Sequence, residues 1–484
     1  MIYGVVLAAG LSTRMGTEKL LLPIGGESMV EATAGRVNAV CDRTLVVVKP
    51  QFAGQFNWDG NTIEVVNDQP GRGQASSVAA AVEWIMEHDP EAESALFFPG
   101  DMPMFDLDCA HRVYERAKGN PQLLVVGRFA GSLCNPCAFG AKWFAELAEL
   151  NGDVGGRQVI RRHPEAVEYV DFPKLPGCDI DTFQDYLEAT LGRRDLVVMR
   201  GAGDIATGSI ARLHSAGFPV VALDIEQPTV IRRTISFAQA LFDGRTEVEG
   251  IVAVRCETLV DIAYALVQGQ VPVVVDPAGS WIARLKPAAV VDAILAKVNC
   301  GTTTDMAPVV VALGPGFTAG QDCHAVIETK RGHTLGSIIY DGSAIPNSGI
   351  PGIIAGYGAE RVIHAPATGT IHLLHDIGDH VEQGECIAMI DDVEVHASLT
   401  GCLRGMIASG MHVDEGLKIA DVDPRDVSEY CNTISDKARA VGGGCLEAVM
   451  HLLAARRQGG EALDNVTAFD AERANRLAKS QHAQ

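Results

Sequence analysis

The residues best suited to chemistry lie near the start of the chain, where an apolar run ends in a glycine loop. Residues 5–9 are apolar, residues 10–16 contain two glycines and Arg14, and Lys19 follows five residues after that arginine. Glycines let backbone N–H groups approach a phosphate, and the two cations add positive charge. The pattern predicts a site for a nucleoside triphosphate, and the alternative is a plain turn between a strand and a helix.

Two aspartates have the chemistry for a metal ion beside that loop. Asp101 follows the apolar segment 94–98, and Asp181 follows a short segment that we predict to be a strand. Carboxylates, phosphate oxygens and water are the ligands that Mg²⁺ prefers. We therefore expect Asp101 and Asp181 to hold Mg²⁺, and the alternative for each is a helix cap or a turn.

Alternating strands and helices must position these side chains. Such alternation predicts a parallel sheet covered by helices, with the ligand beyond the carboxyl ends of the strands. Buried strands are predicted at 2–9, 44–48, 63–66 and 94–98, with helices near 28–40 and 75–88.

A longer series of residues extends the pattern through the first domain. The series comprises Leu7-Ala8-Ala9-Gly10, Ser12, Arg14-Met15-Gly16, Lys19, Gly73, Ser77, Asp101-Met102-Pro103, Asn135-Pro136 and Asp179-Ile180-Asp181-Thr182. By this series, residues 1–192 resemble the MobA/MocA-type nucleotidyltransferases, which attach CMP or GMP to molybdopterin.

The resemblance implies a role for each matching residue. Arg14 and Lys19 would neutralise the β- and γ-phosphates, and Asp101 and Asp181 would hold Mg²⁺, which makes these four the expected catalytic residues. The pterin cofactor's terminal phosphate would attack the α-phosphorus and release pyrophosphate. The nucleotide-binding residues would be Leu7, Ala8, Ala9, Gly10, Ser12, Arg14, Gly16, Lys19, Gly73 and Ser77.

Two positions bear on the substrate. Guanylyl-transferring relatives have glycine where this chain has Ala9, and the extra methyl group favours CTP over GTP. Cytidylyl-transferring relatives have histidine where this chain has Asn135, which places the acceptor in question. Asn135 lies within Cys134-Asn135-Pro136-Cys137, where a redox or zinc role is the lesser alternative because the chain has no second Cys-x-x-Cys.

A second glycine loop begins the next domain. Gly201 and Gly203 follow a predicted strand, and Asp224 ends the next strand, at the spacing of a dinucleotide-binding loop. A nucleotide-like ligand and a tight strand–helix turn remain alternatives.

Further ligand candidates follow that loop. Arg232 and Arg233 suit the binding of an anion, or they lie on a solvated surface. Cys300 lies in a loop of small polar residues that suits a ligand, although a buried, unreactive thiol is the expected state for this cysteine.

Motifs along 195–455 resemble the YqeB family, an accessory protein of selenium-dependent molybdenum hydroxylases. The matching motifs include residues 201–208, Glu226-Gln227-Pro228, Asn299-Cys300-Gly301 and residues 434–444. The resemblance implies a role in hydroxylase maturation and an apo-hydroxylase as partner.

The expected fold class is α/β and multidomain. A Rossmann-like nucleotidyltransferase domain at 1–192 precedes a second Rossmann-like domain at 195–344. Short strands at 345–425 resemble a biotinyl/lipoyl-type barrel-sandwich hybrid without the carrier lysine, and 426–484 is a helical tail. Histidines 364, 372, 375, 380 and 396 lack helical zinc-site spacing and are expected at the surface, and convergence across strands is the lesser alternative.

Composition narrows the function further. The 484 residues carry a formal charge of −22, which disfavours nucleic acid and anionic membranes as partners. The chain shows neither a signal peptide nor a membrane span, so we expect a cytoplasmic protein with reduced cysteines. Two hypotheses remain: a Mg²⁺-dependent cytidylyltransferase in hydroxylase maturation, and a non-catalytic chaperone that delivers the cofactor.

Overall fold

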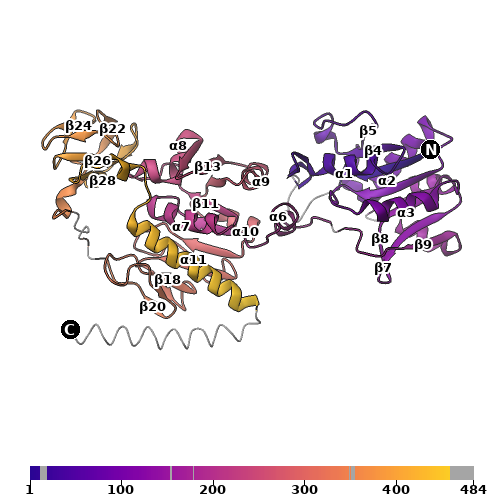
Figure 1. Cartoon of the computed structure of the whole chain (residues 1–484). Coiled ribbons are helices and arrows are strands. Elements are labelled where there is room, and N and C mark those ends of the chain that lie inside the picture. The colour runs from indigo at the N-terminus through magenta and orange to yellow at the C-terminus, as the bar shows by residue number, and fades with distance from the viewer. Residues whose placement is uncertain (11–18, 153–154, 178, 348, 350–354, 458–484) are drawn as a thin grey trace. The chain divides into compact units, whose positions relative to one another are not determined.

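The computed structural model describes residues 1–10, 19–152, 155–177, 179–347, 349 and 355–457. The chain divides after Gly192 into two compact units, and each combines helices with sheets (Figure 1). The predicted mixed α/β architecture is confirmed. None of the described helices has both the length and the apolar character needed to cross a membrane.

The first unit is built on a seven-stranded sheet in the order β5-β4-β1-β6-β8-β7-β9. The predicted parallel pairing holds for β1 with β4 and β6 and for β4 with β5, whereas β8 runs antiparallel to both of its neighbours. The strands are β1 (Ile2–Leu7), β4 (Arg43–Val48), β5 (Thr62–Val66), β6 (Ser94–Pro99), β7 (Leu124–Phe129), β8 (Ser132–Gly140) and β9 (Val167–Asp171).

Side chains of β1 alternate between the two faces of this sheet, as the period of a strand requires. Ile2 and Val6 join one apolar cluster, and Tyr3 and Val5 join another. Burial on both faces places β1 at the centre of the unit. The helices are α1 (Met29–Asn38), α2 (Gln74–His88), α3 (Leu107–Ala117), α4 (Phe144–Ala148), α5 (Arg157–Arg162) and α6 (Phe183–Leu191).

One predicted element of the first unit is wrong. No strand precedes Asp181 among the described residues between β9 and α6. The backbone there is held instead by a hydrogen bond from the Ile180 N–H to the Asp101 carbonyl, at 3.0 Å. Together with a hydrogen bond of 2.6 Å from the Asp106 N–H to the Pro176 carbonyl, this contact with the segment after β6 replaces the expected sheet pairing.

The second unit is built on a nine-stranded sheet in the order β12-β13-β14-β11-β10-β15-β16-β18-β19. Its predicted strands are present and parallel from β13 to β18. The strands are β10 (Val197–Arg200), β11 (Val220–Asp224), β12 (Arg245–Val248), β13 (Ile251–Cys256), β14 (Val271–Val275), β15 (Ala289–Asp292), β16 (Val309–Leu313), β18 (Ala325–Ile327) and β19 (Ile338–Ile339). The helices are α7 (Asp204–Ser215), α8 (Ala240–Asp243), α9 (Leu259–Val267), α10 (Ser280–Leu285) and α11 (Asp436–Arg457).

The last described helix, α11, belongs to the core of this unit. It lies against α7 (Figure 1), and Val441, Cys445 and Leu452 share an apolar cluster with the central strands. Glycines allow the two helices to approach: a Cβ atom on Gly442 would lie 2.4 Å from the Gly208 carbonyl oxygen. The described part of the C-terminal segment therefore completes the fold.

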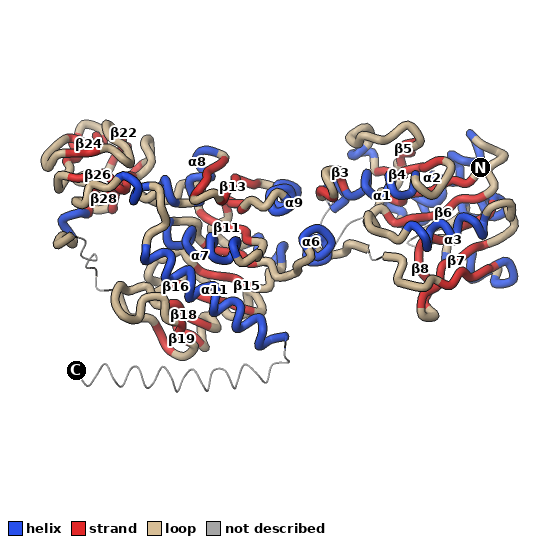
Figure 2. Tube along the Cα trace, in the orientation of Figure 1, coloured by secondary structure: helices blue, strands red, loops and turns tan. Residues whose placement is uncertain are grey.

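Short strands form a β-rich part of the second unit (Figure 2). Two four-stranded sheets share one apolar cluster, which includes Ile371, Leu403 and Val422. The first sheet comprises β21 (Val362–His364), β28 (Lys418–Asp423), β26 (Gly401–Met406) and β23 (His380–Val381), and the second comprises β25 (Val393–His396), β24 (Cys386–Ile390), β22 (Gly369–Leu373) and β27 (His412–Val413).

The contact between α7 and α11 predicts different outcomes for two adjacent glycines. Gly442→Ala should lower the free energy of unfolding by about 1–3 kcal/mol, because the new methyl group overlaps the α7 backbone. Gly443 has open space around its Cβ position, so Gly443→Ala should be neutral or stabilising by up to about 1 kcal/mol. Calorimetry of both variants tests this, and equal stabilities would contradict the packing argument.

Candidate functional site

The site forms where β1 and β6 end side by side. The Gly100 N–H donates to the Leu7 carbonyl at 3.1 Å, and the Thr33 hydroxyl donates to the Gly100 carbonyl at 3.1 Å. A Cβ atom at position 100 would lie 3.0 Å from the Leu7 oxygen, so glycine permits this close approach. The contact places Asp101 directly beside the end of β1.

Lys19 connects the two predicted metal-binding aspartates. Its side chain is only 6% exposed, and its Nζ lies 2.5 Å from Asp101 Oδ2 and 3.3 Å from Asp181 Oδ1. A buried ammonium group needs such partners, because burial removes its hydration. The structure thus brings together three of the four predicted catalytic residues, Lys19, Asp101 and Asp181. The fourth, Arg14, lies outside the described residues, as do Ser12 and Gly16.

A third carboxylate, Asp179, adjoins this group and received no separate role from the sequence. Burial raises the pKa of Asp179, and repulsion from Asp101 and Asp181 raises it further, while Lys19 and Arg157 act in the opposite direction. The site therefore concentrates more negative charge than the sequence analysis assigned to it. A polyphosphate cannot approach such a site unless cations offset the carboxylates.

A cavity of about 730 Å³ adjoins the carboxylates. Its volume lies in the range of small-molecule sites. Among the described residues, both Asp101 and Asp179 line it, together with Asn135 on β8 and the cation Arg157 at the start of α5. The family resemblance extends to Gly155 and Arg157, but the sequence analysis assigned this arginine no role.

The other predicted nucleotide-binding residues lie around the same edge. Ala8 and Ala9 follow β1 and are 2% and 1% exposed. Gly73 adopts a positive φ of 88° immediately before α2. The Ser77 hydroxyl accepts a hydrogen bond of 3.1 Å from the Asn67 side chain. Their roles toward a nucleotide stay predictions.

Burial disfavours redox or zinc chemistry at the Cys-x-x-Cys segment. Desolvation raises the pKa of the Cys137 thiol to about 12, which suppresses the thiolate that either chemistry requires. Cys134 and Cys137 are both free thiols, and Asn135 between them faces the cavity.

In the second unit, the Asp224 carboxylate forms a hydrogen bond with the glycine loop at residues 201–203. This carboxylate accepts hydrogen bonds from the Ala202 N–H at 2.7 Å and from the Ile225 N–H at 2.8 Å, and burial raises its pKa. Gly201, at φ 98°, packs against the Ala293 carbonyl, where a Cβ atom would lie only 2.7 Å away. Contacts with Asp224 and Ala293 therefore stabilise the loop up to Gly203.

The paired arginines contact the β-rich part of the unit. Arg232 is 6% exposed and donates to the Tyr430 carbonyl at 2.8 Å, and Arg233 donates to the Met406 carbonyl at 2.7 Å and pairs with Asp376. Neither arginine lies on a solvated surface, which was one of the two alternatives that the sequence left open.

The expected burial of Cys300 is wrong, because this side chain is exposed. Arg200 stabilises the loop that carries Cys300, because it donates to the Cys300 carbonyl at 3.1 Å and also bonds to Thr302. The buried arginine thus holds the backbone of this loop, while the thiol is exposed. Of the five histidines expected at the surface of the β-rich part, His364, His372, His380 and His396 are exposed, and His375 is half-buried.

Comparisons with known proteins bear on both units. Residues 4–167 match the family described as "MobA-like NTP transferase domain". The chain is 32% identical over 198 residues to a molybdenum cofactor guanylyltransferase of Rhodopseudomonas palustris (strain BisB5), covering 38% of this chain and 90% of that protein. It is 53% identical over 258 residues to the uncharacterized protein YqeB of Escherichia coli (strain K12), covering 53% of this chain and 48% of YqeB.

A solved structure is also similar. The Rv0371c homolog from Mycobacterium sp. strain JC1 is 28% identical, with a TM-score of 0.34, over 38% of this chain and 92% of that one. By its match to the guanylyltransferase, the chain belongs to the MobA-like NTP transferase family. The chain spans about half the length of YqeB, and the resemblance to YqeB is confirmed over about half of this chain.

The raised pKa of Asp179 predicts a pH-dependent stability. The folded state holds this proton more tightly than the unfolded chain does, so stability falls as the pH rises from about 4, the usual aspartate value, through the raised value. Asp179→Asn should therefore unfold at a higher temperature than the parent at neutral pH and at a similar temperature near pH 3.

Thermal unfolding across that range measures the difference. Asp108→Asn, at an exposed aspartate on α3, is the control for the loss of one charge and should show no such pH dependence. A parent chain that is more stable than Asp179→Asn at neutral pH would contradict the assignment.

Proposed function

We propose that the first unit transfers a nucleotidyl group from a nucleoside triphosphate to molybdopterin or the molybdenum cofactor and releases pyrophosphate. The observation that carries the proposal is the contact of Lys19 with both Asp101 and Asp181 at the end of the central strands. Family membership and the adjoining cavity support the same reaction class.

A divalent metal fits the residues present. Asp101 and Asp181 offer carboxylate oxygens on the same ammonium group, so their oxygens already lie near one another. Such oxygens are the ligands of Mg²⁺, which would neutralise charge on the phosphates when bound. Asp101 and Asp181 would hold the ion, and the Lys19 ammonium group would turn toward the phosphates.

The protein's own contribution is then positioning and charge. Phosphoryl and nucleotidyl transfer depend mainly on alignment and electrostatic stabilisation. Arg157 adds a cation at the cavity wall, and Asn135 presents an amide that can hydrogen-bond the acceptor phosphate. We assign the loop with Arg14 to the triphosphate and the cavity to the acceptor.

We further propose CTP as the donor nucleotide. Ala9 adds a methyl group at the end of β1 where guanylyl-transferring relatives have glycine, and its burial leaves that methyl group little room to move away. The R. palustris relative is named a guanylyltransferase, so GTP is the competing donor.

The second unit suggests which protein receives the nucleotide form of the cofactor. From the resemblance of residues 195–455 to the YqeB family, we propose a role in the maturation of a selenium-dependent molybdenum hydroxylase, with the apo-hydroxylase as partner in the cytoplasm. A tethered second unit would receive the product at a high effective concentration. The alternative is a chaperone that binds the cofactor without catalysis.

Asp101→Asn should reduce acceptor-dependent pyrophosphate release by at least about 100-fold, because it removes one charge from the reacting centre. Asp108→Asn should retain the parent rate. An unchanged rate in Asp101→Asn would contradict the assignment. If the parent binds nucleotide and cofactor tightly but releases no pyrophosphate, the chaperone alternative is supported instead.

Nucleotide choice is tested by comparing pyrophosphate release from Mg-CTP and Mg-GTP with a molybdopterin acceptor. The parent should prefer CTP, and Ala9→Gly should raise the ratio of GTP to CTP turnover because it removes the methyl group. Ala8→Gly is the control at the neighbouring position. A parent that prefers GTP would overturn the CTP proposal but leave the reaction class intact.

A further inference from the structure

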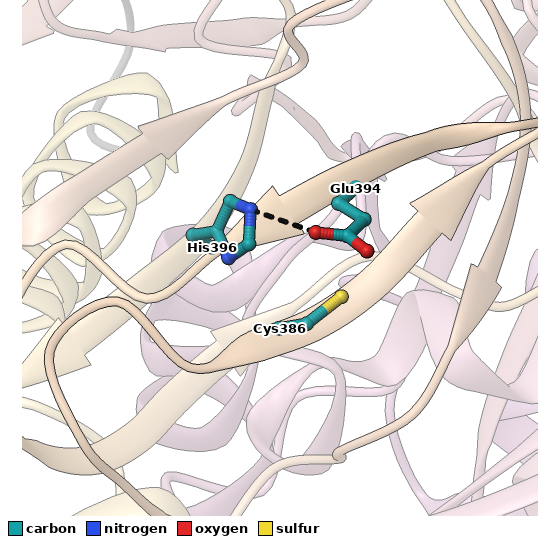
Figure 3. A group of neighbouring side chains, drawn as sticks. All are labelled: Cys386, Glu394 and His396. Carbon is teal, nitrogen blue, oxygen red and sulfur yellow. Dashed lines mark ion pairs between the residues drawn. The ribbon is translucent and has the colours of Figure 1, made fainter.

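The hairpin of β24 and β25 brings three metal-ligating side chains together (Figure 3). Cys386 lies on β24, Glu394 and His396 lie on β25, and their ligand atoms all lie within 4.8 Å of one another. Within the described part of the chain, no other group of three such side chains meets this spacing. The group lies in the second unit and takes no part in the proposed nucleotidyl transfer.

A β-bulge produces this arrangement. Cys386 pairs with His396 and Met389 pairs with Glu394, but the register shifts directly after Cys386. On a regular strand, residues three apart point to opposite faces. Ile387, at the bulge, is buried, and the extra residue leaves Cys386 on the same face as Met389. Bulges re-aim side chains in this way near functional sites.

Hydrogen bonding orients His396 for coordination. Its Nδ1 lies 3.0 Å from the Gly384 carbonyl oxygen and donates to it, because a carbonyl oxygen can only accept. The other nitrogen, Nε2, lies 3.2 Å from Glu394 Oε2, and a metal ion between the two atoms would take the place of the proton that joins them in the ion pair. Histidines that bind metals commonly donate their second ring N–H to a carbonyl in this manner.

The spacing agrees with a tetrahedral ion. Zinc–nitrogen and zinc–oxygen bonds of about 2.0–2.2 Å place two such ligand atoms roughly 3.3 Å apart. The observed 3.2 Å between the ligand atoms of His396 and Glu394 is close to that value. Small side-chain rotations therefore suffice to seat an ion between the two strands.

We propose that Cys386, Glu394 and His396 bind a divalent ion of the zinc type. A thiolate, an imidazole and a carboxylate suit Zn²⁺ and leave a fourth position open. The Met389 sulfur lies 4.0 Å from the Cys386 sulfur, but a thioether is a poor ligand for Zn²⁺, so water would take that position. A sulfur ligand disfavours Mg²⁺, so this site differs in chemistry from the pair Asp101 and Asp181.

The experiment is zinc binding by the full, reduced chain, with excess Mg²⁺ to occupy the aspartate site. Competition with a chromogenic chelator should show Zn²⁺ binding that Cys386→Ser and His396→Gln each weaken by at least about 100-fold, more than the loss of an outer hydrogen bond causes. With Co²⁺ as probe, the parent should show tetrahedral ligand-field bands and a thiolate charge-transfer band, and Cys386→Ser should lose that band.

Matched controls separate this site from other thiols and imidazoles. Cys300→Ser changes an exposed cysteine and His412→Gln changes an exposed histidine of the β-rich part, and both should bind like the parent. Circular dichroism of the metal-free variants checks that they fold. The proposal is overturned if the parent binds no Zn²⁺, or if folded Cys386→Ser and His396→Gln bind it as the parent does. None of these readouts depends on nucleotidyl transfer.

Discussion

The first unit depends on the balance of charge between Lys19 and the aspartates around it. Carboxylates gathered in a partly buried place repel one another, and an ammonium group buried without partners loses its hydration with no compensation. The contacts of Lys19 with Asp101 and Asp181 reduce the repulsion between the carboxylates and compensate the ammonium group for its lost hydration. They also connect the segment after the first glycine loop, the loop after β6 and the segment before α6, which lie far apart in the sequence.

Lys19 does not offset all the negative charge of the aspartates, and this excess negative charge explains the chemistry that we propose. Three carboxylates gather at one buried lysine, and burial raises the pKa of Asp179, with repulsion from Asp101 and Asp181 adding to the effect. Cations that arrive with the substrate would remove the excess, so binding of a metal–nucleotide complex is favoured over binding of the nucleotide alone. The site is thus suited to a cationic partner before any acceptor arrives.

Local patterns predicted much of the fold and part of the site. Apolar runs such as 44–48 and 94–98 indicated buried strands because burial on both faces of a sheet leaves a continuous apolar segment. Side-chain partners that depend on distant residues were not predictable. Nothing near Asp224 in sequence indicates that its carboxylate bonds to the Ala202 N–H, and nothing near Cys300 indicates that Arg200 lies beneath its loop.

The hairpin of β24 and β25 shows a further limit of sequence reasoning. The histidines of this region lack the helical spacing of a zinc site, so a metal site formed across strands was only the lesser alternative. Antiparallel pairing joins positions such as Cys386 and His396 instead, and a bulge changes which residues share a face. A one-residue register shift cannot be read from the period of apolar residues alone, since Ile387 and its neighbour are both buried.

The contacts of Arg232, Arg233 and Thr234 have an evolutionary consequence. All three side chains donate to main-chain carbonyls, those of Tyr430, Met406 and Cys431 respectively. Every residue type supplies a carbonyl oxygen, so the acceptors survive when those side chains are exchanged. Met406 and Cys431 are themselves buried, so among the three acceptor positions only the exposed Tyr430 is free to vary, while the attachment to the α/β core is inherited with the backbone.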